Sequence, residues 1–245
     1  MLNRFDSDRP GSVALAAATA GLVAGLVAAL FVTLAAEPSI EEAIQIEAAA
    51  VHGHGDDREL VSRDVQRGAG LFAAYALTGA GFGVLFASAF VLLGSRPPDP
   101  FRRALVAGAV LAGTLTVSPW LKYPPNPPAV GHPDTLGRRQ LLYVTLLVLT
   151  AVVAVVAVRL SRRLRDVGWD DARRITAVAA AVALPLLVAY GLLPGAPDRV
   201  DVPATLVWRF RLASLGGNLA LWTVLTLGFG LLASRRRSAP APSAA

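Results

Sequence analysis

The stretch S-P-W-L-K-Y-P-P-N-P-P-A-V-G, residues 118–131, lies near the middle of the 245-residue chain, between two apolar segments. Six prolines fall between Pro119 and Pro133, and each lacks a backbone donor and has a fixed φ angle. The residue before each proline is also pushed toward extended backbone. The stretch therefore predicts a stiff, non-helical connection, close to polyproline II, between two helices. Three of its residues are typical of the layer between hydrocarbon and water: Trp120, Lys122 and Tyr123.

The composition on both sides of this stretch is that of a membrane protein. Hydrophobic residues make up 54% of the chain and charged residues 16%, against about 25% charged in soluble domains. We expect an all-α, polytopic helix bundle that forms one membrane domain over residues 1–236, followed by a disordered tail at 237–245. Apolar runs near the roughly 20 residues that cross a bilayer predict six spans: 12–36, 69–93, 103–121, 140–158, 174–193 and 212–234.

Charged residues are unevenly distributed between alternate connections. The two tails and the second and fourth connections hold fourteen of the 23 Lys and Arg residues and six of the 17 acidic ones. The first, third and fifth connections hold nine basic and eleven acidic residues. Because Lys and Arg are enriched in cytoplasmic loops, we expect both termini to be cytoplasmic in a multi-pass protein of the inner membrane. The same rule accounts for the net charge of +6 without nucleic acid as a partner.

Small residues recur within the spans at helical spacing. Every fourth residue is small in two stretches: Ala17, Gly21, Gly25 and Ala29 in the first span, and Gly79 and Gly83 in the second. Such faces let two helices approach closely, and a glycine-lined conduction path is the alternative. The spans contain no charged residue away from their ends, so a proton relay has no support. Asn218, in the sixth span, is expected to bond a neighbouring helix or to touch a transported solute.

Metal-binding side chains are concentrated in the connections expected to face outside. The longest of them, residues 37–68, is expected to begin with an amphipathic helix at Glu37-Pro38 that lies at the membrane surface or against the bundle. It continues with V-H-G-H-G-D-D at 51–57, where alternate side chains of an extended chain point the same way. Imidazole with carboxylate suits Co²⁺, Ni²⁺ or Zn²⁺ better than Mg²⁺ or Ca²⁺. The pattern predicts a capture site for a divalent cation, with a solvated pair of histidines as the alternative; its candidate ligands are His52, His54, Asp56, Asp57 and, on the next outer connection, His132.

The remaining motifs exclude the familiar enzyme classes. The chain has no H-E-x-x-H, no G-x-S-x-G and no phosphate loop. It also has no cysteine, which excludes thiolate metal sites and cysteine nucleophiles. We therefore expect neither an enzyme nor a resident cofactor. A membrane enzyme in which surface His and Asp activate water is the remaining enzymatic alternative.

Five short motifs resemble CbtA, a family of predicted cobalt transporter subunits. They are E-P-S-I-E-E-A-I-Q-I-E (37–47), R-D-V-Q-R-G-A-G-L-F (63–72), L-K-Y-P-P-N-P-P-A-V-G (121–131), D-T-L-G-R-R (134–139) and W-R-F-R-L-A-S-L (208–215), and the resemblance extends from about residue 13 to about residue 232. It implies a role in cobalt uptake, linked to vitamin B12 metabolism, beside a small one-span partner subunit that carries a histidine motif. Members are often described with five spans; a count of five here would omit the third span.

The resemblance also implies roles for individual residues. Three are implied as metal contacts, namely Glu37, Glu47 and His52, and three as structural or pathway positions, namely Tyr123, Asn126 and Arg209. We add Lys122 and Asn218 to the second group. The leading hypothesis is a permease subunit for Co²⁺, which would be the transported ion. Its expected partners are the lipid bilayer, further copies of the chain and the one-span subunit. The alternative is a scaffold or assembly subunit that transports nothing itself.

Overall fold

The structure is a computed structural model that describes residues 10–50, 62–94, 99–128, 130–131, 133–197, 200 and 202–237. Within these residues the chain is helical, without strands, as expected. The elements are α1 (Pro10–Ala35), α2 (Glu37–Ala50), α3 (Arg63–Val65), η1 (Gln66–Gly70), α4 (Leu71–Leu92), α5 (Pro100–Ala112), η2 (Gly113–Val117), α6 (Ser118–Lys122), η3 (Pro133–Thr135), α7 (Leu136–Asp166), α8 (Asp171–Leu192) and α9 (Ala204–Arg237).

Six described helical segments are long and apolar enough to cross a membrane, which confirms the predicted count. They are Gly11–Ala35, Arg63–Leu92, Pro100–Lys122, Leu136–Asp166, Asp171–Leu192 and Ala204–Ser234. The third, expected at 103–121, has 23 residues, and helix continues through Pro119 to Lys122. Helix α9 ends at Arg237, one residue into the stretch expected to be a tail, and residues 238–245 lie outside the described part of the chain.

The prediction that Ser118–Lys122 is non-helical is wrong, and the turn before Pro119 explains why. Residues Gly113–Val117 form a π-helical turn in which Ser118 N–H donates to the Gly113 carbonyl. The next bond of this pattern would run from residue 119 to the Thr114 carbonyl, but proline has no N–H. Instead, the Thr150 hydroxyl of α7 lies 3.2 Å from the Thr114 carbonyl and 2.9 Å from the Leu147 carbonyl of its own helix, so its one hydrogen is shared between these two acceptors. The Thr114 carbonyl therefore has a donor within reach where the helix passes Pro119, and the helix ends at Lys122.

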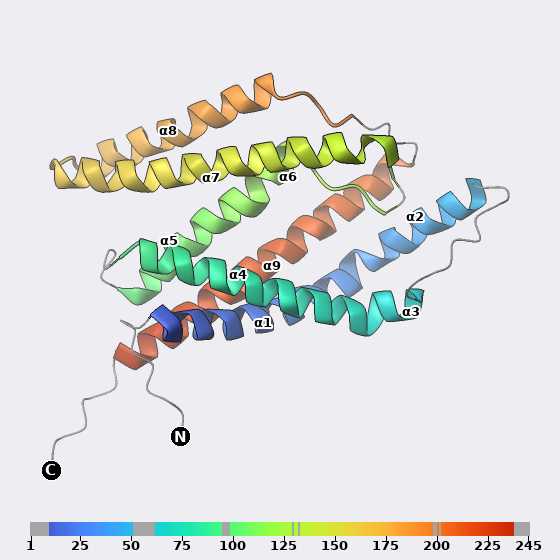
Figure 1. Cartoon of the computed structure of the whole chain (residues 1–245), viewed down its shortest axis with the longest axis horizontal. Coiled ribbons are helices and arrows are strands. Elements are labelled where there is room, and N and C mark those ends of the chain that lie inside the picture. The colour runs from blue at the N-terminus through green and yellow to red at the C-terminus, as the bar shows by residue number, and fades with distance from the viewer. Residues whose placement is uncertain are drawn as a thin grey trace, which may run out of the picture.

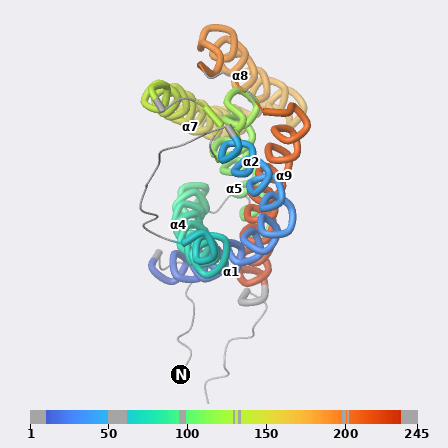
Figure 2. Tube along the Cα trace, turned by 90° about the vertical axis from the view of Figure 1, so that its right-hand side faces the viewer, coloured from blue at the N-terminus to red at the C-terminus, as the bar shows by residue number. Residues whose placement is uncertain are grey.

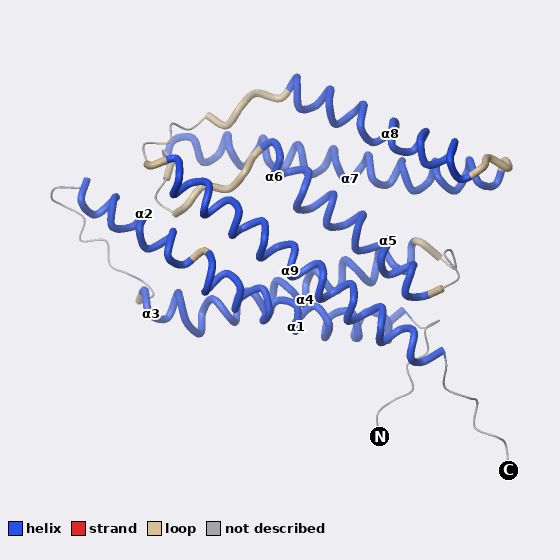
Figure 3. Tube along the Cα trace, turned by 180° about the vertical axis from the view of Figure 1, so that it is seen from behind, coloured by secondary structure: helices blue, strands red, loops and turns tan. Residues whose placement is uncertain are grey.

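The helices form three layers when the bundle is seen end on (Figure 2). One layer contains α1 and α4, the middle one α5 and α9, and the third α7 and α8. Aromatic rings fill part of the interior between the first two layers: Phe229 packs edge-on against Phe86 and Phe90, with ring centroids 5.2 and 4.9 Å away. Figure 3 shows that the loops between these helices lie at the two ends of the bundle.

Glycines bring α1 and α4 into backbone contact. A Cβ added to Gly21 would lie 2.1 Å from the Gly79 oxygen, and one added to Gly79 would lie 2.2 Å from the Gly21 oxygen. The same closeness joins Gly25 to Tyr75 and Gly83 to Ala17, each at 2.1 Å. Only residues without a side chain allow this approach. The small-residue faces are therefore packing surfaces, as the first interpretation of the sequence held.

The connections separate into two groups at opposite ends of the bundle (Figure 1). The start of α1, the α4–α5 and α7–α8 connections and the end of α9 lie at one end. At the other end are α2, α3, the loop after α6, the start of α7 and the start of α9. Helix α2 begins at Glu37 as expected and packs against α1 and α9, with Ser39 and Ala43 buried. We call this second end, which holds the outer connections of the predicted topology, the strap end.

Candidate functional site

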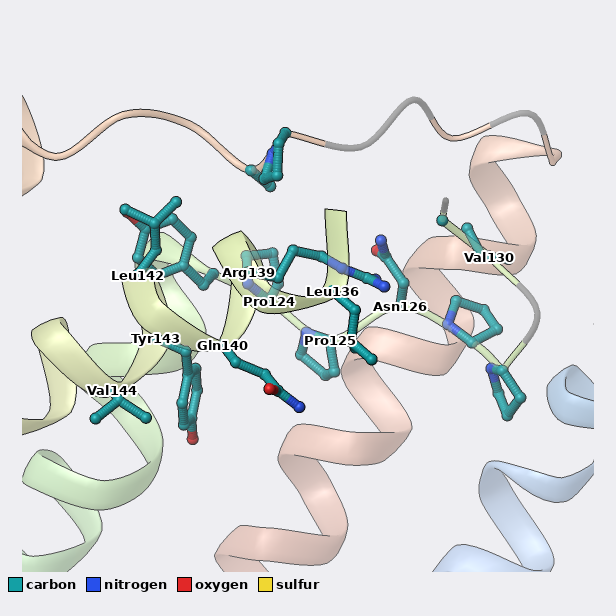
Figure 4. A pocket seen from close by; sticks show the side chains of 16 residues that line it. Pro124, Pro125, Asn126, Val130, Leu136, Arg139, Gln140, Leu142, Tyr143 and Val144 are labelled. Atoms are coloured by element: carbon teal, nitrogen blue, oxygen red, sulfur yellow. The ribbon is translucent and has the colours of Figure 1, made fainter. Parts of the chain in front are cut away.

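The non-helical backbone after α6, residues 123–128, 130 and 131, crosses the strap end and is named here the proline strap. Between it, the first turns of α7 and residues 196–197 lies a cavity of about 790 Å³ (Figure 4). The polar side chains that line it are Tyr123, Asn126, Arg139, Gln140 and Tyr143. Figure 4 shows the Arg139 side chain extending toward Asn126. The strap is therefore more than a linker, because it forms one wall of this cavity.

Arg211 of α9 fixes the middle of the strap. Its Nη2 donates to Asn126 Oδ1 at 2.8 Å, and its Nε donates to the Pro125 carbonyl at 3.3 Å. The Arg211 carbonyl in turn accepts a bond from Trp120 Nε1 at 3.2 Å. A planar guanidinium with several fixed donors suits this double contact. Asn126, predicted as a structural or pathway residue, therefore uses its oxygen to hold the strap against the last span.

Lys122 and Tyr123, at the start of the strap, attach to the end of α8. Lys122 Nζ donates to the Tyr190 carbonyl at 2.7 Å, a favourable place for a cation because carbonyls at a helix C-terminus are partly negative. The Tyr123 hydroxyl donates to the Pro194 carbonyl at 2.8 Å. Burial raises the pKa of Tyr123 above its usual value of 10.0, so this hydroxyl keeps its proton at neutral pH. The Tyr190 hydroxyl bonds Ser118 on α6, both its carbonyl and its Oγ, at 2.6 and 2.9 Å.

Two ion pairs hold α2 at the strap end. Glu37 Oε1 lies 2.5 Å from Arg63 Nη2, and the Glu37 side chain is 16% exposed. Glu42 Oε2 lies 2.7 Å from Arg209 Nη2 in a more exposed setting. Glu37, predicted to contact metal, is thus already neutralised by an arginine, and Arg209 is a partner of α2. Glu47 lies on the same helix and is exposed.

The other predicted metal ligands, His52, His54, Asp56, Asp57 and His132, lie outside the described residues. Among the residues that the structure describes, no group of three or more His, Cys, Asp or Glu side chains is placed to hold a metal ion. In the sequence, these residues are flanked by α2, α3 and the start of α7. All three lie at the strap end (Figure 1).

Asn218, the predicted polar residue of the sixth span, does not bond a neighbouring helix through its amide nitrogen. Its Nδ2 donates to the Ser214 carbonyl at 2.9 Å, one turn earlier in α9 itself. Among the described residues, side chains that do join helical segments include Tyr190, Thr150 and Trp222, which bond Ser118, Thr114 and Thr116, and Arg211 joins α9 to the strap. None of these four was assigned such a contact from the sequence. Arg211 carried a usable signal, because an arginine beside a long apolar run needs a partner for its charge. The resemblance implied a role for Arg209 instead. Arg209 and Arg211 are two residues apart on α9, so their side chains lie on different faces of the helix and have different partners.

Comparison with known proteins places the chain in a family. Residues 11–234 match the family described as probable cobalt transporter subunit, CbtA. No curated protein matches the chain, and no solved structure does. The match includes all six membrane-spanning helices and the proline strap. Because it covers nearly the whole sequence, the chain belongs to the CbtA family of probable cobalt transporter subunits.

Proposed function

We propose that the chain is the membrane-spanning subunit of an uptake transporter for Co²⁺ or a similar divalent transition metal, and that the imported ion serves vitamin B12 metabolism. The observation that carries the proposal is the family match over residues 11–234. Six long apolar helices support it, because a permease subunit must cross the bilayer. The metal is a substrate here, and the proposal includes neither a resident cofactor nor an enzymatic reaction.

The strap end faces outward from an inner membrane in this proposal, and the α7–α8 connection faces the cytoplasm. The support is the excess of arginine in that connection and beside the end of α9. With the cell interior negative, the membrane potential would favour entry of a divalent cation by about 4.6 kcal/mol per 100 mV, twice the single-charge value. Uptake down this potential needs no nucleotide site on the chain.

Capture of the ion is assigned to the side chains at the strap end. The proposed ligands are His52, His54, His132, Glu47, Asp56 and Asp57, a nitrogen and oxygen set that suits late first-row divalent metals. Exposed Glu47 lies near the end of α2, just before the histidine segment. Glu37 is the weaker ligand of the predicted set, because Arg63 already occupies its carboxylate.

A second candidate function is a scaffold that holds a metal-binding partner. The contacts of Lys122, Tyr123 and Asn126 favour it, since all three bond to other parts of this chain and keep the strap in place. A rigid strap is a suitable docking surface for the small one-span histidine-bearing subunit that we propose as a partner. The same rigidity would equally keep the mouth of a permease open.

Uptake of radioactive cobalt distinguishes the two functions. Cells that lack the protein should accumulate cobalt more slowly under metal limitation, and accumulation at the wild-type rate would overturn both proposals. His52→Ala with His54→Ala should reduce uptake in a permease while the protein level stays normal. In a scaffold the same double change leaves uptake intact, whereas Asn126→Ala abolishes co-purification of the one-span subunit.

A further inference from the structure

A second cavity lies within the membrane-spanning part, between α5–η2–α6, α7 and α8. Its volume is about 620 Å³, and its wall is mainly apolar, with Val153, Ala157, Val182 and Leu186 among the lining residues. A smaller cavity of about 470 Å³ adjoins it and includes Arg174 in its lining. The two share four lining residues, Ser161, Val178, Val182 and Ala183. Together they form one groove along α8, named here the α8 groove.

The groove has a cationic end and an apolar middle. Arg174, in the first turn of α8, has a side chain that is only 11% exposed, and its Nη2 lies 2.8 Å from the exposed Asp171. The surrounding connection, residues 159–174, contains six arginines and three aspartates, so the region stays positively charged after this pairing. At the far end, the hydroxyls of Ser118 and Tyr190 bond each other and need no further partner.

We propose that the α8 groove binds an anionic phospholipid, with one acyl chain along α8 and the phosphate beside Arg174 and Ser161. Basic pockets between membrane helices recognise anionic headgroups in this way. The dimensions agree: from Arg174 to Ala183 the helix rises about 14 Å, close to half of the roughly 30 Å hydrocarbon thickness. Helix α8 is also the least buried of the six spans, so much of its surface is left for lipid.

Neighbouring residues provide matched controls for this proposal. Arg173 precedes Arg174 and loses the same charge on substitution, but its side chain is 81% exposed, pairs with Asp170 and does not line the groove. Ala180 lies on α8, one turn before Ala183, and lines neither of the two cavities. Both alanines are exposed, so a phenylalanine fits at either position.

Native mass spectrometry of the purified full-length chain, with equal amounts of phosphatidylglycerol and phosphatidylcholine of the same acyl length, tests the proposal. The wild-type chain should retain phosphatidylglycerol preferentially. Arg174→Gln should reduce that retention about tenfold, whereas Arg173→Gln should leave it unchanged. Ala183→Phe should reduce retention of both lipids, whereas Ala180→Phe should not.

Two results would overturn the proposal. Equal losses for Arg173→Gln and Arg174→Gln would mean that surface charge alone attracts the lipid. Unchanged retention by Ala183→Phe would mean that no acyl chain occupies the groove. If Ala183→Phe fails to fold, Ala179→Phe blocks the groove instead, at an exposed position that lines the smaller cavity, and retention by a folded Ala179→Phe chain at the wild-type level would also contradict the proposal.

Discussion

Arg211 of α9 donates to Asn126 Oδ1 at 2.8 Å and thereby ties the last membrane span to the middle of the proline strap. Its Nε also donates to the Pro125 carbonyl, so one side chain holds two neighbouring strap residues. Lysine keeps the charge but lacks the planar fork that makes both bonds. We expect Arg211→Lys to lower the free energy of unfolding by about 1.5–3 kcal/mol, the usual value for hydrogen bonds from a charged group. Thermal unfolding of the purified protein in detergent measures the change.

Arg209→Lys is the matched control for Arg211→Lys. Arg209 lies two residues earlier on the same helix, and its ion pair with Glu42 is exposed, with 58% of the arginine side chain accessible. Exposed pairs contribute about 0–1 kcal/mol, so this variant should unfold close to the wild type. Equal destabilisation by both substitutions would show that the bonds of Arg211 to the strap stabilise the fold no more than the exposed ion pair of Arg209 does.

The glycine contact between α1 and α4 predicts a second pair of variants. Gly79→Ala would place its Cβ 2.2 Å from the Gly21 oxygen, a backbone atom that cannot turn aside. The helices must separate, at a cost of about 1–3 kcal/mol or more. Gly81→Ala, two residues along α4, meets nothing within 4 Å and should fold as well as the wild type. The yield of monodisperse protein after extraction compares them, and a normal yield of Gly79→Ala would contradict the close contact.

Thr150 supplies the hydrogen bond that Pro119 cannot, which predicts a cost for removing its hydroxyl. Thr150→Val keeps the shape of the side chain but leaves the Thr114 carbonyl without this donor. Bonds of this kind within membrane proteins contribute about 0.6 kcal/mol on average and up to about 1.7 kcal/mol. We expect a loss in that range, measured by unfolding in mixed micelles. Thr145→Val, at an exposed position of α7, should have no effect, and an equal loss there would indicate a general cost of valine on this helix.

The raised pKa of Tyr123 predicts how its contribution to stability depends on pH. A tyrosine whose folded pKa exceeds its unfolded value stabilises the fold fully below the unfolded pKa, and this stabilisation is lost as pH rises through the folded pKa. The difference in unfolding free energy between wild type and Tyr123→Phe should therefore be constant from about pH 6 to about pH 9 and decrease above about pH 10. A difference that already changes near neutral pH would implicate another group.

The sequence alone predicts the membrane spans well but predicts the hydrogen bonds between them poorly. Six apolar runs are visible because the bilayer requires about 20 apolar residues in a row, and Gly21 and Gly79 stand out because only small residues permit close packing. The helix through Pro119 was not predicted because the donor near the Thr114 carbonyl is Thr150, which follows Pro119 by 31 residues in the chain. A proline rule that considers only local backbone predicts a break there.

The candidate site was predicted in part, for a similar reason. The motif L-K-Y-P-P-N-P-P drew attention to Lys122, Tyr123 and Asn126, and the structure places all three in contacts around the strap. Their partners lie 68 to 85 residues away and include two backbone carbonyls, which carry no signal in a sequence. Arg211 could have been found from its charge beside an apolar span, but its partner could not.

The ion pair of Glu37 with Arg63 predicts the outcome of a charge exchange. Glu37→Arg alone places two cations together and should lower both protein stability, by about 1–3 kcal/mol, and cobalt uptake. The double variant Glu37→Arg with Arg63→Glu restores the pair with reversed polarity. If the carboxylate serves only to fasten α2, the exchange should recover both thermal stability and radioactive cobalt uptake. Recovered stability with uptake still absent would assign Glu37 to the metal instead. Glu47→Gln, which changes an exposed carboxylate on the same helix, should leave stability unchanged and reduce uptake if the proposed capture site is correct.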